Sequence, residues 1–159
     1  MEAEEFIEKY RLGVRNFVGA KLLGANLGGA NLSNVNMSGA KLQEANLRGA
    51  NLCKANLFGA DLSGADLRKA NLRLTLLQGA DLTGADLREA DLHGADLREV
   101  DLKSAKLSGT NLSGADLSET NLHEVDLVGA NLDNTDRRPG LSSLAGGGSG
   151  PYLLGSPGQ

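Results

Sequence analysis

The chain has 159 residues, a formal net charge of −4, 40% hydrophobic residues and only 3% aromatic residues. This composition is typical of a water-soluble, mildly acidic protein, and no apolar run is long enough to span a membrane. An acidic chain without a basic patch lacks the electrostatic footprint of a protein that binds nucleic acid directly. The single cysteine, Cys53, excludes an internal disulfide.

Residues 2–12 predict a short helix with acidic residues near its start and basic residues near its end. Its apolar residues fall on one helical face: Ala3, Phe6, Ile7 and Tyr10. We expect residues 1–14 to form a cap over the first unit of the region that follows, because an open repeat array exposes its apolar interior. A membrane anchor is disfavoured because the polar face is acidic. No secretory signal pattern is visible, so a cytoplasmic location is expected.

Residues 15–134 carry a five-residue repeat without interruption. A large apolar residue stands at the centre of 24 consecutive pentapeptides, from Phe17 to Leu132, and 22 of these centres are Leu. The residue two before the centre is Ala in 17 units, the residue just before it is Asn or Asp in 20, and Gly takes the second position after it in 13. Such a short fixed period predicts a stack of units that depend on their neighbours.

A period of five fits neither a helix nor a straight strand. On a helix a step of five turns the leucine through roughly 140°, and on a strand successive leucines alternate between the two faces. Ala and Leu two positions apart do share one side of a short extended segment, and Gly then permits a bend. We therefore predict an all-β solenoid in which four bends close a square coil of about 20 residues, giving about six coils with leucine inside.

The units GANLGGANL, GANLRGANL, GADLSGADL and GADLTGADL resemble the pentapeptide repeat family, whose consensus is A(D/N)LXX. The resemblance implies a right-handed quadrilateral β-helix, and the handedness rests on it alone. Members of that family have diverse functions. Some resemble duplex DNA in shape and charge and act on DNA gyrase, and the abundance of such families in cyanobacteria and chloroplasts implies a regulatory role there.

The repeat departs most from its consensus at residues 73–79, RLTLLQG. Leu74 stands at an outward position, and Leu76 stands where every other unit has Asn, Asp or Lys. Phe58 lies one coil earlier on the same face as Leu76. Exposed apolar patches tend to mark contact sites, although single exposed apolar residues are normal. We name Phe58, Leu74 and Leu76 the apolar corner and take them as candidate partner-binding residues.

Outward residues recur on one face every 20 positions and form columns. One column alternates arginine with aspartate from the neighbouring position, which suits a solvated face: Arg48, Arg68 and Arg88 beside Asp66 and Asp86. Another contains three stacked carboxylates, the acidic ladder of Asp61, Asp81 and Asp101, with Lys103 nearby. Stacking at about 4.8 Å could raise the carboxylate pKa values or attract cations. The favoured interpretation is that these acids hydrogen-bond backbone groups and keep the surface soluble.

No arrangement of residues predicts catalysis, a metal site or a cofactor site. His93 and His123 fall on opposite faces, and Cys53 is two coils from His93 with Arg73 between them, so no zinc site is expected. A leucine-filled interior leaves no room for a substrate pocket. We expect a protein that is not an enzyme.

The repeat register is predicted to end at Asn134, because Arg137 takes the place of the next leucine and Pro139 opposes regular continuation. Residues 135–159 are rich in Gly, Ser and Pro and predict a flexible tail. Its GGGSG resembles an engineered spacer. Its last apolar residues could instead fold back over the final coil or dock on a neighbouring molecule: Tyr152, Leu153 and Leu154.

The leading functional hypothesis is a non-catalytic scaffold or regulatory module that binds an unidentified protein through its flat faces, as a monomer or as a weak dimer through a solenoid end. The alternative is a DNA-mimic modulator of DNA gyrase or topoisomerase. A DNA mimic needs a dense acidic stripe, whereas the repeats hold 12 Lys and Arg against 15 Asp and Glu. The alternative therefore ranks second.

Overall fold

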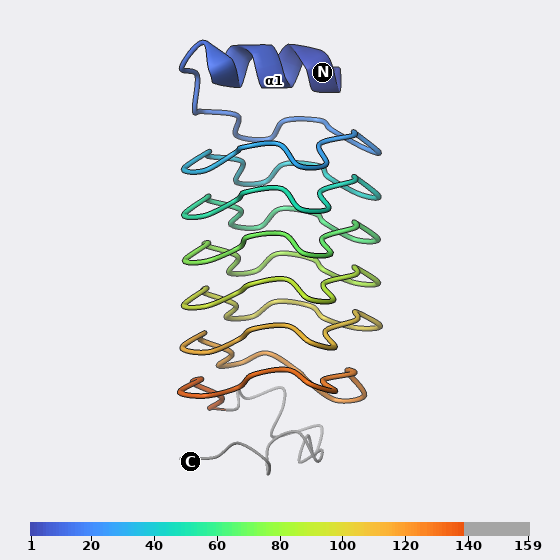
Figure 1. Ribbon diagram of the computed structural model, residues 1–159, viewed down its shortest axis with the longest axis vertical. Helices are drawn as coiled ribbons and strands as arrows, with labels where there is room; N and C mark the ends of the chain where they lie inside the picture. The colour runs from blue at the N-terminus through green and yellow to red at the C-terminus, as the bar shows by residue number, and fades with distance from the viewer. Residues whose placement is uncertain (139–159) are drawn as a thin grey trace.

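The computed structural model describes residues 1–138. Most of the predicted tail, including Tyr152, Leu153 and Leu154, lies outside the described residues. Within residues 1–138 the only helix is α1 (Ala3–Arg11), and it is too short to cross a membrane. After α1 the chain winds into a stack of coils that lie one above another (Figure 1). The protein is therefore a β-helical solenoid.

Isolated parallel bridges, one residue long, join neighbouring coils. Each bridge links a residue to the one 20 positions later, from Asn16 with Asn36 to Asp116 with Asp136. The bridging residue is the one just before each repeat centre. The N–H of the centre donates to the next coil, as from Leu42 to the carbonyl of Asp61 at 2.8 Å. The 20-residue register expected from the repeat is therefore present.

A tight turn follows every repeat centre. The second residue after the centre has a positive φ in all 24 units, and this residue is Gly in 13 of them. The next N–H donates back to the centre, as from Ala45 to the Leu42 carbonyl at 3.0 Å, which is the geometry of a type II turn. Gly adopts this conformation freely, whereas Glu44 and Leu74, each with φ 58°, carry a cost of about 1–2 kcal/mol.

The interior of the solenoid is a column of leucine and alanine. The 22 centres from Phe17 to Leu122 are each at most 5% exposed, and most of the alanines two positions before them are buried as well. Burying a leucine side chain stabilises a fold by about 1.5–3 kcal/mol. The core therefore runs the length of the stack, and the residues that reach the surface are the one directly before and the two directly after each centre.

Helix α1 lies across the N-terminal end of the stack (Figure 1). Phe6 is fully buried, and its ring meets that of Phe17 edge-on with 4.5 Å between centroids. The Tyr10 hydroxyl donates to the carbonyl of Ser33 at 2.8 Å, and the Arg15 guanidinium lies 3.7 Å from the Tyr10 ring centre. The apolar face of the helix is therefore turned onto the first coil.

The backbone ladder continues beyond Asn134, where the sequence predicted its end. Asp136 bridges to Asp116, and the Glu119 N–H donates to the Arg138 carbonyl at 3.0 Å. Asp136 still precedes a repeat centre and accepts the backbone N–H of Arg138 at 3.2 Å. The predicted boundary is too early because this turn chemistry persists after leucine has been lost from the centre.

One side of the stack is open between its last two coils. Within residues 1–138, the expected hydrogen bonds from the N–H groups of Leu102 and Ser104 to the carbonyls of Asn121 and His123 are missing. A cavity of about 450 Å³ lies at this position. We call this region the open side.

Two bulky inward residues explain the open side. The position two before the centre, which is Ala on the four preceding coils of this side, is Val100 and then Thr120. The Thr120 hydroxyl donates to the Leu97 carbonyl. Two stacked β-branched side chains need more room than two alanines, so they hold the coils apart at this position.

Candidate functional site

The side chain of an Asn or Asp before a repeat centre forms a hydrogen bond with the backbone of the same unit. Its Oδ1 accepts the N–H two residues later, as Asn46 does from Arg48 at 3.0 Å and Asp81 does from Thr83 at 2.9 Å. This contact is an Asx turn, in which the side chain supports the bend. The residues just after the centre and those at the corners therefore determine the charge and polarity of each face.

After Arg15, whose guanidinium donates back to the carbonyls of Tyr10 and Val14, one face carries no charged side chain over its first four coils. Bridges align Asn16, Asn36, Asn56 and Leu76 in one column. This uncharged face consists of that column, the column after the centres and the adjoining glycines: Asn16, Val18, Gly19, Asn36, Ser38, Gly39, Asn56, Phe58, Gly59, Leu76, Gln78 and Gly79. The other faces carry charged residues on the same coils. Loss of charge around an exposed aromatic residue is typical of the centre of a protein interface.

The structure places two residues of the apolar corner on the uncharged face and the third at its edge. Phe58, Leu74 and Leu76 are 54%, 46% and 48% exposed. The Leu57 N–H donates to the Leu76 carbonyl at 2.7 Å, so Phe58 and Leu76 lie in adjacent coils. Leu74 is at the neighbouring corner, with its side chain over Gly94. Val18, which is 58% exposed, extends the apolar character toward α1.

The asparagines of the uncharged face keep their side-chain N–H groups available. On the adjacent face, Asn51 donates to Asn31 at 3.3 Å and Asn71 donates to Asn51 at 3.2 Å, which forms a ladder of side-chain amides. On the uncharged face, three asparagines accept a backbone N–H but donate no side-chain hydrogen bond to any residue in 1–138: Asn16, Asn36 and Asn56. This row of amide donors can serve a partner.

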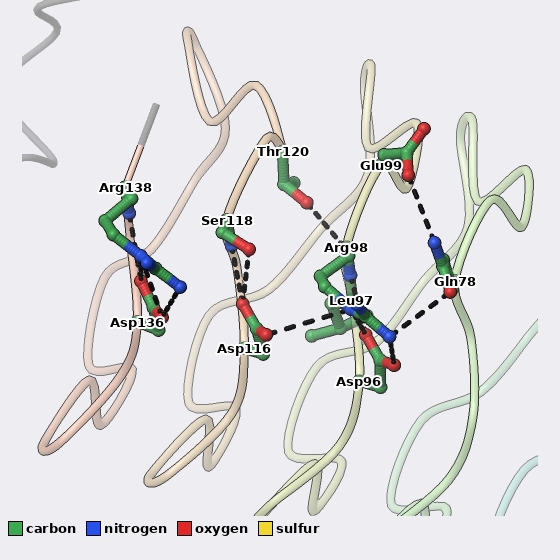
Figure 2. Close-up of polar contacts among 10 residues, drawn as sticks. All are labelled: Gln78, Asp96, Leu97, Arg98, Glu99, Asp116, Ser118, Thr120, Asp136 and Arg138. Carbon is green, nitrogen blue, oxygen red and sulfur yellow. Dashed lines mark hydrogen bonds and ion pairs between the residues drawn. The ribbon is translucent and has the colours of Figure 1, made fainter. Parts of the chain in front are cut away.

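The same side of the solenoid becomes charged beyond Gln78 (Figure 2). Arg98 donates to both oxygens of Asp96, at 2.8 and 2.6 Å, and to the Gln78 side-chain oxygen at 3.2 Å. The Oδ2 atom of Asp116 lies 3.8 Å from Arg98 Nε. The hydrogen bond and charge of Arg98 hold the pKa of Asp96 below its usual value despite partial burial. Gln78 therefore marks the border of the uncharged face.

Asp61, the first residue of the acidic ladder, is well provided with donors. It accepts the Ser63 backbone N–H at 3.1 Å, the Ser63 hydroxyl at 2.7 Å and the Gln43 amide at 2.8 Å. Burial raises the pKa of Asp61. The hydrogen bonds from Ser63 and the charge of Lys41 lower it by more than burial raises it, so the pKa is below its usual value. The alternative interpretation, that stacking raises the carboxylate pKa, is therefore wrong for Asp61.

The other two members of the acidic ladder also support the backbone. Asp81 accepts the N–H of Thr83 at 2.9 Å, and Asp101 accepts the N–H of Lys103 at 3.0 Å. The Lys103 ammonium group forms no ion pair with any of residues 1–138. The three acids therefore make the backbone contacts that the favoured interpretation expected.

The arginine column shows the predicted alternation of charge. Arg68 donates to both oxygens of Asp66 at 2.9 and 2.7 Å, and Arg88 donates to both oxygens of Asp86 at 2.8 and 2.6 Å. These hydrogen bonds hold the pKa values of Asp66 and Asp86 below their usual value, against the opposing effect of burial.

His93 and Ser113 form a contact that the sequence did not predict. The Nδ1 atom of His93 lies 2.8 Å from the Ser113 hydroxyl of the next coil. Asp91 accepts the backbone N–H of His93 rather than its ring, and Arg73 lies 3.0 Å from the other oxygen of Asp91. Among residues 1–138, no carboxylate therefore accepts a hydrogen bond from the imidazole to orient it. No group of His, Cys, Asp and Glu within residues 1–138 could hold a metal ion.

Coils of 20 residues, a turn after every centre and an Asx contact before it define a β-solenoid built from pentapeptides. The family model described as pentapeptide repeats matches eight copies over residues 16–49, 36–73, 74–103 and 101–136. The chain belongs to the pentapeptide repeat family.

Several solved structures of the same family are similar to this chain. QnrB1, described as a plasmid-mediated fluoroquinolone resistance protein, is 27% identical with a TM-score of 0.50, and the match covers 75% of this chain and 68% of QnrB1. The pentapeptide repeat protein alr5209 from Nostoc PCC 7120 is 35% identical, with coverage of 86% and 96% and a TM-score of 0.37. Rfr23 from Cyanothece 51142 is 33% identical, with coverage of 80% and 95% and a TM-score of 0.35. No protein of curated function matches this chain.

The uncharged face was not predicted, although the sequence contains the signal. Aligning the positions 20 residues apart places Asn16, Asn36, Asn56 and Leu76 in one column. The departure from consensus at residues 73–79 identifies single side chains that differ from the repeat pattern. The face is instead defined by what its residues share, which is the lack of charge.

Proposed function

We propose that this protein is a non-catalytic scaffold that binds a partner protein through the uncharged face. The observation that supports the proposal is the absence of charge after Arg15 over four coils of one face, around the exposed side chains of Phe58 and Leu76. Burying such a surface removes few charges from water, so its apolar contacts are not offset by a large desolvation cost.

The architecture suits this role. A leucine core beneath every face fixes the positions of the outward residues, which lowers the ordering cost on binding. Binding energy at interfaces is concentrated in a few central residues, often aromatic. Phe58 is the aromatic residue of the uncharged face and lies beside Leu76, so these two residues are the proposed energetic centre.

The test is capture of partners from the native cell with two matched double variants. Phe58→Ser with Leu76→Asn removes the apolar centre, and Asn is the residue that precedes Leu76 in its column. Leu23→Ser with Val128→Ser removes two apolar residues from other faces that are even more exposed than Phe58 and Leu76. The proposal expects partners to be lost with the first variant and kept with the second. Partners retained by both, with circular dichroism unchanged, would show that binding occurs elsewhere.

We also propose that α1 is a cap on a right-handed helix of about six coils. The buried contact between Phe6 and Phe17 supports the cap, and one coil for each 20 residues supports the count. Deleting residues 1–13 should expose the first coil and cause association, which light scattering after size exclusion measures. A truncated protein that stays monomeric and equally stable would contradict the cap.

A second candidate function is modulation of DNA gyrase. It is favoured by the likeness to QnrB1, a fluoroquinolone resistance protein. This function would use the acidic ladder rather than the uncharged face. It predicts salt-sensitive inhibition of purified gyrase that is lost when Asp61, Asp81 and Asp101 are changed to Asn. No effect on supercoiling by gyrase would remove this candidate and leave the scaffold proposal standing.

A further inference from the structure

A shallow cavity lies over the arginine column, on a different face from the proposed partner surface. It has a volume of about 170 Å³ and is lined by Arg48, Arg68, Lys69, Arg88 and Glu89. We call it the arginine groove. Four of its five lining residues are cationic, although the whole chain has a net charge of −4.

Two of these arginines are oriented by aspartates but keep unused donors. Arg68 uses Nε and Nη2 for Asp66, and Arg88 uses the same two atoms for Asp86. A guanidinium has five N–H groups, so each fork leaves the Nη1 group and one Nη2 hydrogen. No residue in 1–138 accepts a hydrogen bond from Nη1 of either arginine. Each fork therefore fixes the direction of its guanidinium without using all of its donors.

Arg48 is not neutralised in the same way. The residue two before it is Asn46 rather than Asp, and Asn46 uses its oxygen for the Arg48 backbone N–H and its amide for Asn26. Within the described part of the chain the Arg48 guanidinium forms no hydrogen bond or ion pair.

The remaining lining residues are a loose ion pair, with 3.9 Å between Lys69 Nζ and Glu89 Oε2. Both are more than half exposed, so this pair neutralises little of the groove. Four cationic groups thus face three carboxylates, those of Asp66, Asp86 and Glu89. The excess of positive charge is centred on Arg48.

We propose that the arginine groove binds a phosphate-type oxyanion. Arginines on successive coils are about 4.8 Å apart, so their donors can reach different oxygens of one tetrahedral group. Guanidinium groups form paired hydrogen bonds with phosphate and hold them at fixed angles. The phosphate can belong to a free small molecule or to a phosphorylated side chain of another protein, because the groove recognises the chemistry that these share.

The test is titration of the isotope-labelled protein with inorganic phosphate, followed by NMR of the arginine side-chain Nε–H signals. Sodium chloride at equal ionic strength controls for screening. Phosphate should shift the signals of Arg48, Arg68 and Arg88 in a saturable way. Arg48→Gln should weaken binding about tenfold, since a charge-assisted hydrogen bond is lost.

Arg98→Gln is the matched control. Arg98 forms the same fork with Asp96, but its column neighbours are Gln78 and Ser118 rather than arginines. Binding should be unchanged in this variant. Chloride-like shifts in the wild type, full affinity in Arg48→Gln, or equal loss in both variants would each overturn the proposal.

A phosphoserine peptide and its unphosphorylated form identify the source of the phosphate. Tighter binding of the phosphopeptide than of inorganic phosphate assigns the groove to a phosphorylated protein, and equal binding assigns it to a free phosphate compound. Both outcomes support the oxyanion site. Binding of the unphosphorylated peptide with equal affinity would contradict it.

Discussion

Leu74 lies directly over Gly94 of the next coil. Its Cδ2 atom is 2.7 Å from the position that a Cβ atom on Gly94 would take, and both residues have positive φ values, 58° and 67°. The Leu74 side chain can therefore take this position only because Gly94 has no side chain. The two residues are coupled through this contact, although they are 20 positions apart.

Replacing Gly94 with Ala should lower the unfolding free energy through two effects. The left-handed backbone costs about 1 kcal/mol for a residue with a Cβ, and displacing the Leu74 side chain from its preferred conformation adds about 0.5–1.5 kcal/mol. Gly79→Ala is the control, since Gly79 has φ 71° and no atom within 4 Å of its Cβ position. Urea unfolding should show a larger loss for Gly94→Ala than for Gly79→Ala.

Leu74→Gly, combined with Gly94→Ala, separates the two effects. Removing the leucine side chain should abolish the clash but not the backbone strain at position 94, so Gly94→Ala should cost about as much in the Leu74→Gly background as Gly79→Ala costs in the wild type. The coupling energy from the double-mutant cycle should exceed about 0.5 kcal/mol. Additive losses would mean that Leu74 simply moves aside when Ala occupies position 94.

Leu92→Ala tests the core. Leu92 is fully buried in the middle of the leucine column, and its neighbours on both sides are fixed by the backbone ladder. The cavity should therefore collapse poorly, and the unfolding free energy should fall by about 2–5 kcal/mol. Leu23→Ala is the control, because Leu23 is 71% exposed and should change stability by less than about 0.5 kcal/mol. Equal effects would contradict the stacked interior.

The pair of Asp96 and Arg98 should make stability depend on pH in the acid range. The folded pKa of Asp96 lies below its usual value because of Arg98. A depressed carboxylate pKa adds stability that is complete above the unfolded value of about 3.9 and is lost as the pH falls through the folded value. The difference in unfolding free energy between the wild type and Arg98→Gln should therefore be constant above about pH 5 and shrink below about pH 4.

Lys103→Gln is the reference for that experiment. The Lys103 ammonium group pairs with no carboxylate among residues 1–138, so its removal should give a difference that hardly changes over the same range. If Arg98→Gln behaves like Lys103→Gln, the Asp96 carboxylate gains nothing from the guanidinium in solution.

Much of this fold can be predicted from the sequence because one rule sets every unit. The same five-residue pattern places Leu42 inside, bends the chain at Glu44 and returns to Ala45, so the rule repeats wherever the residues repeat. The register survives even at Asp136, because the turn chemistry is local. The sequence did not predict side-chain contacts that depend on the neighbouring coil, as between the ring of His93 and the hydroxyl of Ser113.

The candidate surfaces were predicted only in part, for the same reason. The apolar corner is visible as three departures from consensus, but the sequence does not show that Leu74 lies over Gly94 or that Gln43 reaches Asp61 from the preceding coil. The arginine groove depends on which N–H groups the aspartates leave unused. Such details follow from side-chain conformation, which a repeat pattern does not determine.

The open side gives a last prediction, because it is attributed to the bulk of the Val100 and Thr120 side chains. The amide hydrogens of Leu102 and Ser104 should exchange faster than those of Leu82 and Gly84, which donate to the next coil at 2.9 Å in the same columns. Val100→Ala should let the coils close and should slow exchange at both sites by restoring these hydrogen bonds. Leu23→Ala, on the same side but at the surface, should leave exchange unchanged. Fast exchange that persists in Val100→Ala would mean that the bulk of residue 100 does not hold the coils apart.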